Sequence, residues 1–199
     1  MFGKLEDSVY KRVTLDDVCM LITDGTHQTP QYTNSRNGIK FLSSKDVTKE
    51  YIDWSNIVYI PFELHEKLHK RLAPQRNDIL LAKNGTIGIA ALNNTDDIFD
   101  VYVSLAVLRP SDKVTPEYLL YAINHEDTRR QFKEGIIGMG VPNLHLNVIK
   151  KTKILLADIE SQNVFSSYVK SIDKLKFDAD IRKKELLTHR ESLINKYFK

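Results

Sequence analysis

The segment DIESQNVFSSYVKSIDKLKFDADIRKKELLTHRESLINKYFK, residues 158–199, contains neither glycine nor proline. Both residues interrupt helices, so their absence over such a length favours one continuous helix. Asp158 can cap its first turn. At about 1.5 Å per residue, the segment is predicted to form a rod of roughly 60 Å.

Apolar side chains recur along this helix at the seven-residue spacing of a coiled coil. One seam position takes Phe165, Ile172, Ala179, Leu186 and Leu193, and the other takes Tyr168, Leu175, Arg182, His189 and Lys196. A lone helix cannot bury this stripe, so it needs a partner, either its own preceding domain or another chain. Because no loop follows the helix, we favour another chain, contacted by Phe165, Tyr168, Ile172, Leu175, Leu186 and Leu193.

Charge is distributed unevenly along the chain. The 199 residues include 29 basic and 26 acidic side chains, which gives a net charge of +3. Residues 1–162 carry a net charge of −1 and residues 163–199 a net charge of +4. This asymmetry agrees with two parts, which we expect to be a domain over 1–157 and the helix over 158–199. The near-neutral balance argues against a protein that holds DNA by bulk charge alone.

Cysteine content and hydropathy limit the environment of the protein. Cys19 is the single cysteine, so an internal disulfide and a cysteine-based zinc site are excluded. The first residues show no apolar stretch of a signal peptide, and no apolar run reaches the roughly 18 residues that span a bilayer. These observations predict a cytoplasmic protein.

The part before the helix mixes short strands with short helices, which predicts an α/β (α+β) domain. Helices are expected from Thr14, capped through Asp17, to Leu21, from Pro61 to Pro74, from Thr115, and in a further piece ending near Gly135. Strands are expected at residues 39–42, 57–60, 101–109 and 153–156, with a two-residue type I′ hairpin at Asn84-Gly85 joining 78–83 to 86–92. Polar loops are expected over residues 22–38 and 138–143.

One motif is typical of zinc enzymes. Residues 65–69 read His-Glu-Lys-Leu-His, which is the H-E-x-x-H pattern of two zinc ligands and a general base. A zinc-dependent hydrolase using His65, Glu66 and His69 is therefore an alternative function. Pro74 ends the helix soon afterwards, and no glutamate follows as a third ligand between 70 and 116. We therefore expect a surface helix with both histidines solvated, no metal and no catalysis.

Polar loops between the expected elements are candidates for contact with DNA. Side chains such as Asn, Arg and Thr can read base edges, whereas lysines contact phosphates without carrying sequence information. Composition alone also fits loops that are polar because they are solvated. The candidate residues are Thr26, His27, Arg36, Ser44, Lys45, Lys83, Asn84, Thr86 and Asn143.

The order of several stretches resembles the DNA specificity subunits of type I restriction–modification systems. The matching stretches are residues 10–18 (YKRVTLDDV), 24–27 (DGTH), 41–47 (FLSSKDV), 77–88 (NDILLAKNGTIG) and the closing helix from 158–162 (DIESQ) to Tyr197-Phe198. A full subunit of this family has two recognition domains and two such helices. This chain has one of each, so the resemblance implies either a half-subunit that dimerises or one piece of a split or truncated subunit, with a recognition domain over 1–157 and a dimerisation and spacer helix over 158–199.

The resemblance also implies partners. They are double-stranded DNA, modification subunits that carry S-adenosylmethionine, and in some assemblies a restriction motor-nuclease subunit. This chain itself would bind no cofactor, read a half-site and form a homodimer through its helix. A coiled-coil adaptor without DNA contact is the remaining alternative.

Overall fold

The computed structural model describes residues 10–34, 37–136 and 142–198. The chain divides into two compact units, residues 1–159 and 160–199. The first unit contains mixed strands and short helices, and the second consists of one long helix, as the sequence predicts. No helix among the described residues is long and apolar enough to cross a membrane.

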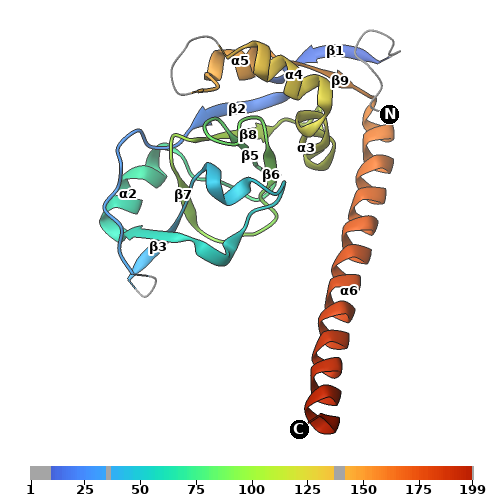
Figure 1. Cartoon of the computed structure of the whole chain (residues 1–199). Helices are drawn as coiled ribbons and strands as arrows, with labels where there is room; N and C mark the ends of the chain where they lie inside the picture. Colours follow the sequence, from blue (N-terminus) through green and yellow to red (C-terminus); the bar gives the residue numbers. More distant parts are fainter. Residues whose placement is uncertain (1–9, 35–36, 137–141, 199) are drawn as a thin grey trace. The chain divides into compact units, whose positions relative to one another are not determined.

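An antiparallel sheet of four strands forms the centre of the first unit (Figure 1). Its order is β2 (Cys19–Asp24), β8 (Leu105–Pro110), β5 (Ile79–Ala82) and β6 (Ala90–Leu92). All four residues of β5 are buried, as are residues 105–108 of β8. Strands that are apolar on both faces need covering on both faces, and the surrounding elements provide it.

A second sheet lies against this centre. It is formed by β4 (Val58–Pro61), β3 (Gly38–Leu42) and β7 (Phe99–Val101), with β3 antiparallel to β4 and parallel to β7. The short 3₁₀ helices Ser44–Val47 and Trp54–Asn56 follow β3, and helix α2 (Phe62–Arg71) contacts all three strands. Leu42, Phe99 and Val101 of this sheet share one apolar cluster with Leu80 and Val107 of the central sheet.

The remaining elements cover the other side of the central sheet. Strand β1 (Lys11–Thr14) pairs with β9 (Lys153–Leu156), accompanied by α1 (Leu15–Val18), α3 (Pro116–Asn124), α4 (Glu126–Glu134) and α5 (Leu146–Lys151). The buried Tyr118 of α3 donates a hydrogen bond to the carbonyl of Leu155 in β9 at 2.9 Å. The predicted caps are present, since Thr14 and Asp17 form a capping box and Thr115 caps α3 ahead of Pro116.

Three predicted elements are wrong in extent. The helix expected over 14–21 ends at Val18, because residues 19–24 form β2 and pair with β8. The single strand expected over 101–109 is divided into β7 and β8, which belong to different sheets. The strand expected over 86–92 starts only at Ala90, so Asn84-Gly85 is part of a longer connection and not a two-residue hairpin. In the first two cases pairing with a distant strand overrides the local pattern.

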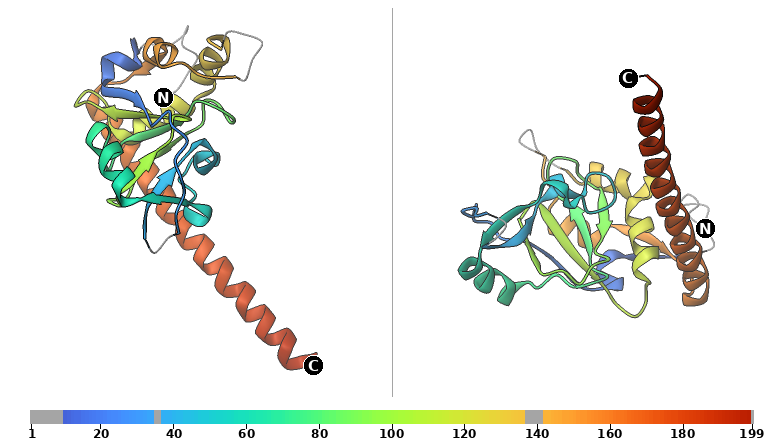
Figure 2. Two further views of the ribbon diagram at one scale, coloured as in Figure 1. Left: turned by 90° about the vertical axis from the view of Figure 1, so that its left-hand side faces the viewer. Right: turned by 90° about the horizontal axis from the view of Figure 1, so that it is seen from below.

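Helix α6 (Ile159–Tyr197) makes up the second unit. It runs without interruption in the views of Figures 1 and 2. Its 39 residues correspond to about 58 Å at 1.5 Å per residue. Every described residue from 171 to 198 is exposed.

Candidate nucleic-acid interface

The turn at Tyr102–Ser104, where the chain passes from one sheet to the other, brings three strand ends together. Thr26, just beyond β2, accepts a hydrogen bond from the Val103 N–H at 2.9 Å. The Leu42 carbonyl at the end of β3 accepts one from the Tyr102 N–H at 2.8 Å, and the Lys83 N–H after β5 donates to the Ser104 carbonyl at 2.8 Å. The polar loops that follow these three strands therefore begin close together at the Tyr102–Ser104 turn, which we call the junction.

Gly25 is required by this close approach. A Cβ atom at this position would lie 1.9 Å from the Val101 carbonyl oxygen and 2.5 Å from the Tyr102 carbonyl carbon. No side chain fits there without moving the backbone of the turn. The Asp24-Gly25 pair thus lets β2 end directly against the junction.

A buried ion pair lies beneath the junction. The Lys83 ammonium is 2.5 Å from Asp24 Oδ2, and the two side chains are only 4% and 10% exposed. His27 Nε2 is 3.4 Å from the other carboxylate oxygen of Asp24, and Arg71 donates to the Asp24 carbonyl at 2.7 Å. Burial strengthens the attraction between the two charges and makes either charge costly without the other.

The connection after Lys83 is held against Asn143 and Leu144. Gly85 adopts the left-handed conformation, with φ of +71°. Asn84 forms an antiparallel bridge with Asn143, and the Leu144 N–H donates to the Lys83 carbonyl at 2.9 Å. Asn143 Oδ1 is buried and has no hydrogen-bond partner among the described residues. The side-chain oxygen of Asn143 is therefore a buried acceptor that still lacks a hydrogen-bond donor among the described residues.

A hollow of about 590 Å³ opens at this junction. Four of the predicted DNA-contact residues line it, namely His27, Lys83, Asn84 and Asn143. They come from three segments that are far apart in the sequence, and the structure brings them together. The other lining residues are Asp24, Val103, His145, Leu146 and Asn147.

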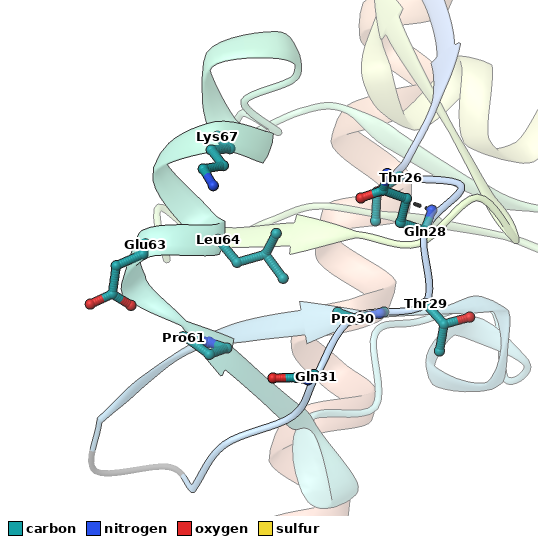
Figure 3. Close-up of a pocket in the computed structure, with 9 residues that line it drawn as sticks. All are labelled: Thr26, Gln28, Thr29, Pro30, Gln31, Pro61, Glu63, Leu64 and Lys67. Carbon is teal, nitrogen blue, oxygen red and sulfur yellow. Dashed lines mark hydrogen bonds between the residues drawn. The ribbon is translucent and has the colours of Figure 1, made fainter.

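A second, smaller hollow of about 350 Å³ lies between the loop after β2 and α2 (Figure 3). Thr26 lines it, and the Gln28 N–H donates to Thr26 Oγ1 at 3.3 Å, which keeps the loop turned. Leu64 extends from α2 toward this loop. The other lining residues are Gln28, Thr29, Pro30, Gln31, Pro61, Glu63 and Lys67.

The remaining predicted contact residues lie around the junction or outside the described residues. The Ser44 N–H donates to Ser104 Oγ at 3.0 Å, and a Cβ on Gly85 would lie 3.8 Å from Ser44 Oγ. Lys45 and Thr86 are exposed. Arg36 and most of the loop expected over 138–143 lie outside the described residues.

Several lining residues were not among the predicted ones. Asp24 pairs with Lys83, and His145 and Asn147 stand at the start of α5. Lys67 lines the smaller hollow from α2. Their polarity was visible in the sequence, but only the approach of residues 143–144 to Lys83 shows that α5 starts at the same hollow.

The prediction of two solvated histidines on α2 is wrong. His65 is buried, and its Nδ1 lies 2.7 Å from Oδ2 of the buried Asp100 on β7. His69 is half-buried, with Nδ1 3.3 Å from Asp100 Oδ1. The helix places its histidine side against the sheet, whereas Glu66, the base of the hydrolase alternative, is exposed.

The predicted seam residues of α6 are open to solvent over most of its length. Tyr168, Ile172, Leu175, Leu186 and Leu193 are between 43% and 70% exposed, and Phe165 is less exposed. Aliphatic side chains on one helix are rarely left in water in such number, so this face is available for another helix.

The chain consists of a mixed α/β unit with a polar junction, followed by a long helix with an exposed apolar seam. The model of the family described as "Type I restriction modification DNA specificity domain" matches residues 8–189. The chain therefore belongs to that family, which confirms the resemblance found in the sequence. A zinc-dependent hydrolase is not favoured by this membership.

Similar proteins include the type I restriction enzyme MjaVIII specificity subunit of Methanocaldococcus jannaschii, 28% identical over 155 residues, which are 75% of this chain and 36% of that protein. The crystal structure of an HsdS subunit from Thermoanaerobacter tengcongensis matches with a TM-score of 0.57 and 16% identity, over 87% of this chain and 40% of that one. A type I restriction–modification S subunit from M. genitalium gives 0.59 and 13%, over 87% and 42%. The chain spans about two-fifths of the length of these relatives.

Proposed function

We propose that this chain is the DNA-recognition subunit of a type I restriction–modification complex. Its first unit binds one half of a bipartite target, and α6 pairs with a second copy to set the spacing. The observation that carries the proposal is the family match over residues 8–189, which includes both units.

The chemistry of the junction supports base reading. Asn84 carries an amide that donates and accepts, and such a group forms paired hydrogen bonds with base edges in the major groove. His27 is exposed at the rim of the same hollow. Lys45 is exposed on the neighbouring 3₁₀ helix, where its ammonium can reach a phosphate and position the chain.

The exposed seam of α6 supports pairing. Two copies of one helix that associate about a two-fold axis bury the same residues on both sides. In an antiparallel pair the two recognition units stand at opposite ends of the rod. Two identical units related in this way read a target whose halves are palindromic, with an unread spacer between them.

Catalysis belongs to the partners in this proposal. Modification subunits bind the chain, hold S-adenosylmethionine and rotate an adenine out of the duplex for methylation. A restriction motor-nuclease subunit joins the same assembly. S-adenosylmethionine is held by the partners, and this chain directs the chemistry by selecting the site.

The test is a methylation map of the source genome with and without this chain. We expect methylated adenines in a bipartite palindrome, and their loss when the chain is deleted. An unchanged methylation pattern would reject the proposal, and a motif with unrelated halves would reject pairing of identical copies.

Insertion of one heptad into the exposed part of α6 tests directly whether this helix sets the spacing between the two half-sites. Seven residues add about 10 Å to the rod, which corresponds to roughly three base pairs of spacer. We expect methylation to move to targets with the same half-sites and a longer spacer. Unchanged spacing would show that α6 does not set it.

A further inference from the structure

Helix α2 and strand β7 bring together three side chains that the proposed function does not use. His65 and His69 stand one turn apart on α2, and their Nδ1 atoms lie 2.7 Å and 3.3 Å from the two carboxylate oxygens of Asp100. The rings of the two histidines are 4.6 Å apart between centroids. One potential ligand atom from each residue lies within 4.8 Å of the others.

We propose that His65, His69 and Asp100 bind a divalent transition-metal ion, with Zn²⁺ as the preferred ion. Two imidazoles and one carboxylate form a donor set that suits zinc, whereas Mg²⁺ and Ca²⁺ prefer oxygen ligands alone. The i, i+4 spacing of the histidines places both on one helix face, as zinc sites on helices require.

The spacing of the ligand atoms is close to what the ion needs. Ligand atoms around tetrahedral zinc lie about 2.0–2.2 Å from the metal and therefore about 3.3–3.6 Å from one another. His65 Nδ1 lies 2.7 Å from Oδ2 of Asp100 and His69 Nδ1 lies 3.3 Å from Oδ1, so the first contact has to widen slightly when an ion enters. All three ligand atoms lie within 4.8 Å of one another, and His69, whose side chain is 32% exposed, is the ligand that can adjust most easily.

Burial gives the site its rigidity and its access. Asp100 is 1% exposed and His65 8%, so two ligands are held by the fold, while His69 faces solvent in part. The buried carboxylate needs a positive or hydrogen-bonding partner, and a metal ion satisfies it more strongly than imidazole N–H groups do. Three protein ligands leave the fourth position to water from the open side.

The role of the ion follows from what it joins. It fastens α2 to β7, and α2 forms one wall of the 350 Å³ hollow through Leu64 and Lys67. A bound ion would therefore hold that wall in place and stabilise the first unit. The ion would act on the stability of the first unit and would take no part in DNA recognition.

The test uses the full-length chain, purified without a histidine tag. Elemental analysis and calorimetric titration with Zn²⁺ are expected to show one ion per chain. The replacement ion Co²⁺ is expected to give the visible absorption bands of a site with nitrogen and oxygen ligands. At a free Zn²⁺ concentration of about 100 times Kd, the Tm is expected to rise by at least about 5 °C over the metal-free protein.

Substitutions separate this site from adventitious binding. His69→Gln changes a partly exposed side chain and is expected to weaken zinc binding by about 100-fold or more while the protein remains folded. Asp100→Asn is expected to act in the same direction. The matched control is His189→Gln, which removes an exposed histidine of α6 and should leave affinity and stoichiometry unchanged.

Two results would overturn the proposal. One is a wild-type protein that takes up no stoichiometric Zn²⁺ or Co²⁺. The other is zinc binding that His69→Gln leaves intact or that His189→Gln reduces equally. Either result would mean that Asp100 is held by hydrogen bonds from the two histidines alone.

Discussion

The two units of the chain differ in how far their apolar residues are buried. In the first unit β5 and residues 105–108 of β8 are covered on both faces, and Leu80, Phe99 and Leu108 are fully buried. In α6, Leu175 and Leu186 remain 67% and 70% exposed. The first unit thus contains its own stabilising core, whereas the apolar seam of the helix stays unburied within this chain and is available to the proposed second copy.

The largest expected effect comes from the seam of α6. Ile172→Asp combined with Leu175→Asp should weaken self-association of the full-length chain by about 100-fold or more, because each apolar side chain contributes roughly 1.5–3 kcal/mol when buried. Light scattering over a concentration series measures the change. The control pair Ser167→Asp and Lys174→Asp lies off the seam and should leave the dimer intact. A wild-type chain that is monomeric at all concentrations would contradict the proposal that the exposed seam of α6 is covered by a second copy.

A second effect concerns the buried ion pair of the first unit. Lys83→Ala leaves Asp24 buried without its main partner and should lower the free energy of unfolding by about 3 kcal/mol. The double change Lys83→Met and Asp24→Leu removes both charges and should cost much less. Urea unfolding monitored by circular dichroism measures both. Equal losses in the two variants would show that packing, not charge, stabilises the junction.

A smaller effect is expected at the cap of α1. The Asp17 carboxylate accepts hydrogen bonds from the Thr14 hydroxyl at 2.7 Å and the Thr14 N–H at 2.8 Å, which lowers the pKa of Asp17. Thr14→Ala should cost about 1 kcal/mol of stability at neutral pH.

The pH dependence of this cap has a defined sign. A lowered carboxyl pKa stabilises the fold above the ordinary pKa of 3.8, and the stabilisation is lost as the pH falls through the lowered value. The difference between wild type and Thr14→Ala should therefore shrink below pH 4. The exposed Thr86→Ala is the control, and a difference that is constant with pH would exclude the contribution of Asp17.

The smallest effect on stability is expected at Lys45. This lysine is exposed, so Lys45→Ala should change the free energy of unfolding by less than about 0.5 kcal/mol. In the assembled complex the same variant should bind DNA more weakly and lower the salt-dependence slope by about 1. Fluorescence anisotropy at several salt concentrations measures the slope. An unchanged slope would remove Lys45 from the contact surface.

Elements with local signals were predicted correctly from the sequence. The capping box at Thr14, the Thr115-Pro116 start of α3 and the long helix without glycine or proline all act within a few residues. These features depend on hydrogen bonds and backbone preferences that the adjacent residues supply.

Features that depend on distant pairing were predicted with the wrong extent or missed, although the strands expected at 39–42, 57–60 and 153–156 are present. Residues 19–24 became a strand because β8 lies beside them, and the stretch 101–109 was divided because its two halves join different sheets. The contact of His65 with Asp100 joins residues 35 positions apart. Periodicity along the chain contains no information on such partners.

The amino-acid sequence by itself determined the helix, its unburied seam and the polar character of the loops, because composition and spacing are local properties. Only the tertiary structure decided that Asp24, Lys83 and Asn143 line one hollow, and that His65 and His69 face a buried carboxylate. The physical reason is that a site of this kind forms where strand ends from distant segments meet, at the turn between two sheets.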